Sequence, residues 1–123
     1  MTAPTSPLAT VVLVEDDAAL REALQYALEI EGYPVVSCDS GEALVEAILP
    51  DAPACLVVDF HLRGMNGVDA LEALRARGVS LPTIVITTAP SLRLRAWAHL
   101  NGATLIEKPL LEDVLIGAIR ALT

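Results

Sequence analysis

The feature that most constrains the fold of this chain is a repeated alternation between short apolar runs and longer amphipathic segments. The short runs are rich in Val, Ile and Thr, which favour strands. The longer segments carry apolar residues at helical spacing, and several of them end at Gly or Pro. The expected strands are 10–14, 34–38, 55–60, 83–87 and 104–107. The expected helices are 18–31, a helix capped by Ser40 that runs to Leu49, 67–77, 91–100 and 111–122.

This order predicts an α/β fold. The runs 10–14, 55–60 and 83–87 are apolar without alternation, as in strands that are covered on both faces. Parallel strands need long crossover connections, and helices of this length provide them. We therefore expect a doubly wound, five-stranded parallel sheet of order 2-1-3-4-5 with five helices. Ligands of such sheets bind beyond the C-terminal ends of the strands, beside strands 1 and 3.

Composition narrows the possible functions. The 123 residues fit one domain, and 54% are apolar but only 3% aromatic, so the core must be aliphatic. A net charge of −8 argues against a nucleic-acid surface, which needs a basic face. The apolar runs are far shorter than the roughly 20 residues of a membrane span. We therefore expect a protein that binds neither nucleic acid nor a membrane.

The N-terminus and the cysteines indicate a cytoplasmic protein. The start MTAPTSPLA lacks the basic and apolar regions of a signal peptide. We expect residues 1–8 to form a flexible arm and residues 9–123 to form the domain. Cys38 and Cys55 are isolated in apolar surroundings, so we expect them to be reduced and buried.

Chemically active residues follow four of the expected strands. The acidic run 15–17 follows the first strand, Asp59 ends the third, Thr87 ends the fourth and Lys108 follows the fifth. Clustered carboxylates repel one another unless a cation neutralises them, and their hard oxygens suit Mg²⁺. A carboxylate nucleophile beside a metal ion and a lysine is equipped to accept a phosphoryl group.

Four segments carry a resemblance to a known family. LVEDD (13–17), VVDFHLRGMNG (57–67), IVIT (84–87) and IEKP (106–109) resemble the signature segments of the receiver domains of two-component response regulators. Their order and spacing cover nearly the whole chain. The resemblance implies the flavodoxin-like receiver fold and a phosphoacceptor signalling domain rather than an enzyme. It implies a phosphohistidine donor on a sensor histidine kinase or phosphotransfer protein, and either a stand-alone receiver or a fragment of a longer chain.

The resemblance also implies a metal site. Asp59 matches the phosphoacceptor, which also touches the Mg²⁺ ion. Asp16 matches a direct ligand, and Glu15 matches an acid that acts mainly through water. The backbone carbonyl of His61 matches the third protein ligand, whereas we expect its imidazole to be an exposed loop side chain. Asp17 is better explained as a helix-start residue.

The remaining matches concern the phosphoryl group. Thr87 matches the hydroxyl that moves to bond a phosphoryl oxygen, and Lys108 matches the lysine that pairs with the group. The resemblance implies a cis bond between Lys108 and Pro109.

Two positions depart from the family. Arg63 stands where proline is usual and adds a hydrogen-bond donor near the site. Leu105 stands where an aromatic ring is usual, so we expect weak coupling between phosphorylation and the surface formed by the fourth helix, fifth strand and fifth helix.

That surface is also predicted to bind a partner or a second copy. In the last helix the expected core stripe is Leu111, Val114, Leu115, Ala118, Ile119 and Leu122. Ile116 falls off this stripe, and the fourth helix offers Leu94 and Trp97. We therefore predict that Ile116, Leu94 and Trp97 contribute to an interface, homodimeric or with an unknown output partner.

Two other functions remain open. A pseudo-receiver would bind partners without accepting a phosphoryl group, and Leu105 leaves that alternative open because the family's usual aromatic ring is missing there. A haloacid dehalogenase-type hydrolase also uses a carboxylate nucleophile and Mg²⁺, but it needs an acid two residues later, where this chain has His61. Phosphorylation by acetyl phosphate with Mg²⁺ distinguishes these alternatives.

Overall fold

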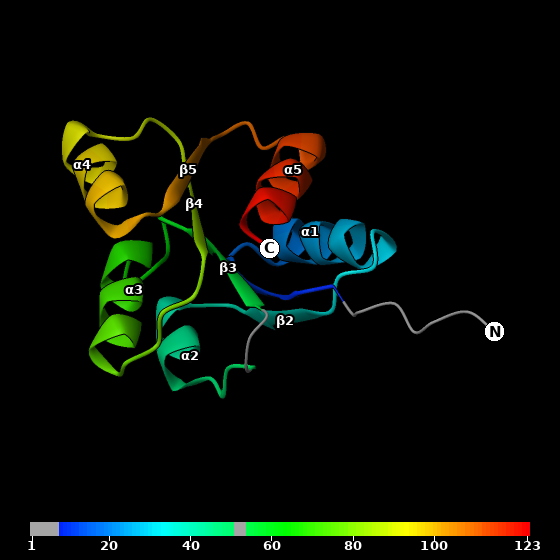
Figure 1. Ribbon diagram of the computed structural model, residues 1–123, viewed down its shortest axis with the longest axis horizontal. Helices are drawn as coiled ribbons and strands as arrows, with labels where there is room; N and C mark the ends of the chain where they lie inside the picture. Colours follow the sequence, from blue (N-terminus) through cyan, green and yellow to red (C-terminus); the bar gives the residue numbers. More distant parts are fainter. Residues whose placement is uncertain (1–7, 51–53) are drawn as a thin grey trace.

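The computed structural model describes residues 8–50 and 54–123, and it confirms five strand–helix units (Figure 1). The strands are β1 (Thr10–Val14), β2 (Val35–Cys38), β3 (Ala54–Asp59), β4 (Thr83–Thr87) and β5 (Thr104–Glu107). The helices are α1 (Ala18–Ile30), α2 (Gly41–Glu46), α3 (Gly67–Ala76), α4 (Leu92–Asn101) and α5 (Glu112–Leu122). The N-terminal arm was predicted over residues 1–8, of which 1–7 lie outside the described residues.

The sheet has the predicted topology. Its strand order is β2-β1-β3-β4-β5, and every neighbouring pair is parallel. Strand β1 lies between β2 and β3, with Val14 opposite both Cys38 and Val58. The C-terminal ends of β1 and β3 therefore meet at the switch point, where the strand order reverses.

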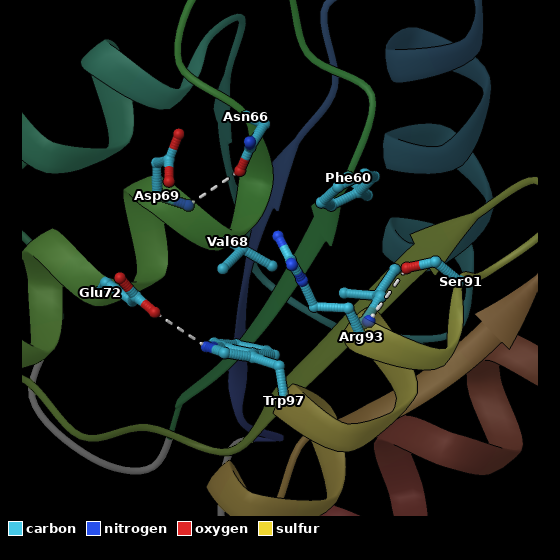
Figure 2. A pocket seen from close by; sticks show the side chains of 9 residues that line it. Phe60, Asn66, Val68, Asp69, Glu72, Ser91, Arg93 and Trp97 are labelled. Atoms are coloured by element: carbon cyan, nitrogen blue, oxygen red, sulfur yellow. Dashed lines mark hydrogen bonds between the residues drawn. The ribbon is translucent and has the colours of Figure 1, made fainter.

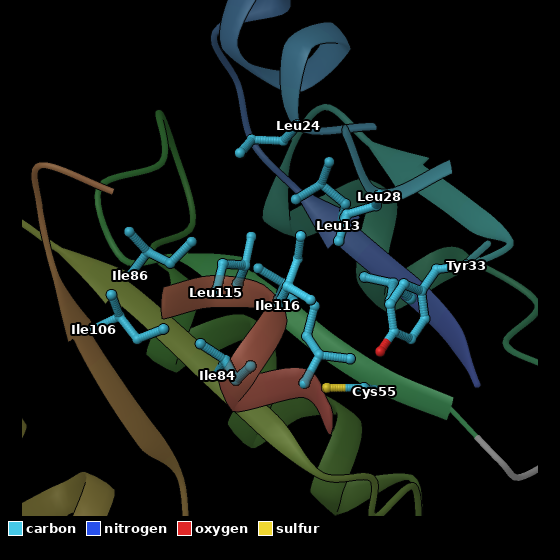
Figure 3. Close-up of a cluster of buried hydrophobic side chains, with 13 residues drawn as sticks. Leu13, Leu24, Leu28, Tyr33, Cys55, Ile84, Ile86, Ile106, Leu115 and Ile116 are labelled. Carbon is cyan, nitrogen blue, oxygen red and sulfur yellow. The ribbon is translucent and has the colours of Figure 1, made fainter. Parts of the chain in front are cut away.

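The strands bury side chains on both faces. Alternate strand residues belong to two core clusters, because successive side chains of a strand point to opposite faces. One cluster lies under α1 and α5 and includes Leu13, Ile84 and Leu115 (Figure 3). The other lies under α2, α3 and α4 and includes Leu44 and Leu74. This double burial explains the uninterrupted apolar runs of the central strands.

The predicted end of the second helix was wrong. Ser40 caps α2 by accepting a hydrogen bond from the Ala43 N–H at 3.0 Å, as expected. The helix ends at Glu46, however, and Ala47 has an extended backbone. The extended chain alternates its side chains, so Ala47 and Leu49 pack on the core while Ile48 is 97% exposed. Elsewhere the predicted bounds agree with the structure to within one residue.

The predicted faces of α5 and α4 were also partly wrong. Ile116 was expected on the surface but is buried in the core, whereas Leu111 and Val114 are exposed. The buried stripe of α5 therefore runs through 115, 116 and 119, because the helix is rotated relative to the expected face. Leu94 of α4 was expected at an interface and is buried as well.

Two further expectations concern burial and the membrane. Cys38 and Cys55 are free and buried, as predicted, and burial raises the pKa of the Cys55 thiol to about 11. Among the described residues, no helix is long and apolar enough to cross a membrane.

Candidate functional site

Asp59 is the centre of the candidate site. It is the last residue of β3, and only 3% of it is exposed. Its Oδ2 accepts a hydrogen bond from Lys108 Nζ at 2.7 Å, and its Oδ1 accepts one from the backbone N–H of His61 at 2.9 Å. The carboxylate is thus held between a cation and a loop amide, although the two donors come from distant parts of the chain.

Lys108 reaches this position from the end of β5. Its backbone N–H donates to the Thr87 carbonyl oxygen at 2.8 Å, which ties the loop after β5 to the end of β4. Burial alone would lower the pKa of Lys108, but its hydrogen bond to Asp59 and the neighbouring acidic charges raise it on balance. The lysine is therefore a stable cation. The Lys108–Pro109 bond is cis, as the resemblance implied.

Glu15 is a second buried acid at the same rim. It follows β1 directly, and only 4% of it is exposed. Burial, followed by the neighbouring Asp59 carboxylate, raises the pKa of Glu15 to about 7. Its Oε2 accepts a hydrogen bond from the Asp17 N–H at 3.2 Å. Two adjacent carboxylates with one lysine leave the rim short of positive charge.

The neighbouring acids Asp16 and Asp17 have different hydrogen-bond partners. Asp17 caps α1 by accepting a hydrogen bond from the Leu20 N–H at 3.0 Å, which confirms its expected place at the helix start. The Oδ2 of Asp16 instead accepts from Arg63, through the backbone N–H at 3.0 Å and through Nε at 3.3 Å. The backbone N–H and guanidinium of Arg63 lower the pKa of Asp16, so this carboxyl remains ionised.

Thr87 lies at the end of β4 and is 1% exposed. Its Oγ1 is 3.4 Å from Nε2 of His61, and the imidazole packs edge-on against Phe60 with ring centres 5.0 Å apart. The His61 side chain is exposed, as predicted, but its contact with Thr87 was not anticipated. The position of the loop after β3 determines this contact, and nothing in the spacing of the two residues indicates it.

Gly67 is a supporting residue at the start of α3, to which the sequence patterns assigned no role in the site. A Cβ atom at this position would lie 2.6 Å from the Asp59 carbonyl oxygen and 3.1 Å from the Phe60 Cα. Both neighbours are backbone atoms, so they cannot move aside as a flexible side chain would. The start of α3 can therefore lie against the end of β3 only because residue 67 has no side chain.

The donor atoms at this rim fit Mg²⁺. Among the described residues, no group of three or more His, Cys, Asp or Glu side chains is arranged to hold a metal ion by itself. Mg²⁺ does not need such a group, because it usually retains several waters and binds through one or two carboxylates. Asp16, Asp59 and the His61 backbone carbonyl can supply oxygen ligands, and Glu15 is a further acid whose side chain interacts with Asp59 and Asp16. The excess of negative charge described above favours a divalent cation here.

A separate groove of about 400 Å³ opens between α3 and α4. Figure 2 shows Phe60, Val68 and Trp97 among its lining residues. The Trp97 Nε1–H donates to Glu72 Oε1 at 3.1 Å, which links the two helices across the groove. Asp59 does not line the groove, but its chain neighbour Phe60 does, so the groove borders the start of the loop between β3 and α3.

Comparison with known protein families shows which family this chain belongs to. A model of the response regulator receiver domain matches residues 11–120. The chain belongs to the receiver domain family of response regulators. The topology 2-1-3-4-5 with five helices is therefore the receiver fold, and the resemblance seen in the four segments is confirmed.

Individual relatives of this receiver domain include two transcriptional regulatory proteins. The transcriptional regulatory protein FixJ of Azorhizobium caulinodans is 35% identical over 112 residues, covering 90% of this chain and 53% of FixJ. The C4-dicarboxylate transport transcriptional regulatory protein DctD of Pseudomonas aeruginosa is 33% identical, covering 96% of this chain and 26% of DctD. A crystal structure of FixJ-N matches with a TM-score of 0.80 and 32% identity, covering 91% of this chain and 90% of that one. This receiver domain thus spans about half of FixJ and about a quarter of DctD.

Proposed function

We propose that this receiver domain is a phosphorylation switch whose acceptor is Asp59. The observation that carries the proposal is the buried Asp59 carboxylate, which Lys108 contacts at 2.7 Å beside a second buried acid, Glu15. A buried carboxylate with a neighbouring cation can act as a nucleophile, and the cation offsets charge on the transferred group.

The reaction follows from these groups. A carboxylate oxygen of Asp59 attacks the phosphorus atom of a phosphohistidine on a sensor histidine kinase or phosphotransfer protein. The new P–O bond forms as the P–N bond breaks, and the nitrogen of the departing imidazole keeps the electron pair of that bond. Lys108 Nζ donates to a phosphoryl oxygen, and the Thr87 hydroxyl moves to donate to another. Mg²⁺ would be held by Asp16, Asp59 and the His61 carbonyl, with Glu15 acting through water, and would supply further charge neutralisation.

A direct test uses acetyl phosphate as the donor. With Mg²⁺ present, intact mass should increase by one phosphoryl group in the unmodified protein, and Asp59→Asn should abolish the increase. Excess chelator should stop labelling in the unmodified protein. Asp39→Asn is the matched control, because Asp39 is an exposed acid that follows the edge strand β2. Labelling of the Asp59 variant, or labelling that persists unchanged in chelator, would refute the acceptor or the metal role respectively.

The same experiment separates the alternatives. A pseudo-receiver would give no labelling of any variant. A hydrolase would release phosphate over many turnovers, whereas a switch should use about one donor per protein and then lose the group slowly. We propose the switch because the acceptor, lysine and threonine predicted from the sequence are all buried or half-buried at one rim.

We propose a cytoplasmic domain that changes the affinity of an output partner or of a second copy at the α4–β5–α5 surface. The exposed apolar residues there are Leu92 and Leu100 of α4, with Leu111 and Val114 beside and on α5. Ile116 and Leu94 are buried, so substitutions there would disturb the core rather than this surface. Leu100→Glu with Val114→Glu should reduce self-association or partner binding without unfolding the domain.

A further inference from the structure

Arg63 is the departure from the family that makes the most specific contact at the acidic rim. It follows Asp59 by four positions and lies in the loop between β3 and α3. Both its backbone N–H and its guanidinium Nε donate to the same oxygen of Asp16, at 3.0 and 3.3 Å. The carboxylate proposed to bind a divalent cation therefore already has a cationic partner.

The two donors of Arg63 have separable effects. The backbone N–H orients Asp16 and would remain after any substitution except proline. The guanidinium contributes a positive charge, and its side chain is 86% exposed whereas that of Asp16 is 18% exposed. An ion pair with one strongly exposed member is weak and is screened by solvent. The guanidinium can therefore leave Asp16 at small cost while the backbone N–H stays in place.

We propose that the Arg63 guanidinium is the resting counter-ion of Asp16 and opposes loading of the acidic site by a divalent cation. This inference rests on the proposed function, and it assigns Arg63 a positioning role that sets the cation concentration needed for phosphorylation. A cation arriving at Asp16 meets the like charge of Arg63, which must swing toward solvent. Proline at this position could provide neither the charge nor the N–H.

The experiment is calorimetric titration of the full chain with MgCl₂ alone, at low and constant ionic strength. Arg63→Ala removes the guanidinium but keeps the backbone N–H, so it should bind Mg²⁺ up to about fivefold more tightly than the unmodified protein. Arg63→Lys keeps the charge and should bind within about twofold of the unmodified protein. Arg120→Ala is the matched control for net charge, because Arg120 is an exposed arginine whose ion pair joins α5 to Glu31 after α1.

A second readout follows the guanidinium itself. In a nuclear magnetic resonance titration, the Nε–H signal of Arg63 should move with the same midpoint as heat release. If the guanidinium made no contact with the cation site, its Nε–H signal would not shift when Mg²⁺ is added.

The outcomes separate this inference from the function on which it rests. Equal or weaker Mg²⁺ binding by Arg63→Ala, an equal gain in Arg120→Ala, or an unmoved Arg63 signal would overturn the counter-ion role and leave the metal site intact. Mg²⁺ binding that is absent, or unchanged by Asp16→Asn, would overturn the metal role in the proposed function together with the role of Arg63.

Discussion

Glu15→Gln should stabilise this protein, and the gain should depend on pH. Glu15 is 4% exposed, and burial beside Asp59 raises its pKa from 4.5 to about 7. A folded-state pKa above the unfolded value gives stability that is complete below pH 4.5 and is lost as pH rises through 7. Glutamine resembles the protonated acid and can still accept the Asp17 N–H, so the variant should avoid this loss.

The magnitude follows from the two pKa values. Each unit of pKa corresponds to about 1.4 kcal/mol, so the ionised Glu15 lowers the free energy of unfolding by about 3 kcal/mol at pH 8. At pH 5 the folded acid is protonated, and only the partial ionisation of the unfolded chain remains, a cost of less than about 1 kcal/mol. The variant should therefore exceed the unmodified protein by about 3 kcal/mol at pH 8 and by under about 1 kcal/mol at pH 5.

Urea unfolding followed by circular dichroism, without divalent cations, measures these differences. Glu22→Gln is the control, because it removes the same charge from an exposed position on α1. Adding Mg²⁺ at pH 8 should narrow the gap, since a cation offsets the charge that makes ionised Glu15 costly. A Glu15→Gln gain of the same size at pH 5 and pH 8, or a loss at pH 8, would show that the buried carboxylate is not the source of the instability.

Two further predictions concern the packing of α3 against β3 and the effect of phosphorylation on α5. Gly67→Ala should destabilise the fold by about 1–3 kcal/mol in urea unfolding and slow labelling of Asp59, because the new methyl group would meet the backbone of Asp59 and Phe60. Gly117→Ala on α5 is the control, because the space around Gly117 is open, and it should be neutral or stabilising in the same measurement. Leu105→Tyr should enlarge the change in amide exchange that a beryllofluoride phosphate mimic produces on α5, and a large change already present in the unmodified protein would contradict the weak coupling expected of Leu105.

The sheet and the acidic rim could be predicted because their determinants are local in the sequence. Uninterrupted runs such as 55–60 mark strands that are buried on both faces, and parallel topology then brings their C-terminal ends to one rim. This reasoning placed Asp59 and Lys108 at the same rim, where their side chains form a hydrogen bond although they are 49 residues apart. The pattern of each run was sufficient to predict a strand, because a strand that is covered on both faces is apolar without alternation.

Features that depend on packing between elements could not be predicted. Ile116 looked exposed because the rotation of α5 is determined by the helices and strands around it, which helical spacing alone does not reveal. The end of α2 depends on Ala47 and Leu49 reaching the core from an extended chain. The contacts of Arg63 with Asp16 and of His61 with Thr87 depend on the path of an irregular loop, which has no periodicity to interpret.

The position of Trp97 gives this domain an optical probe of its own. It is the sole tryptophan, and aromatic residues are only 3% of the chain, so its fluorescence is measured against little background. Its indole is half-buried, donates to Glu72 on α3, and has the Arg75 guanidinium 6.0 Å from its ring centre. A change in the spacing of α3 and α4 would alter the hydration and charge around the indole together. Emission wavelength and intensity can therefore follow events at this groove in real time, with no dye attached and no residue replaced.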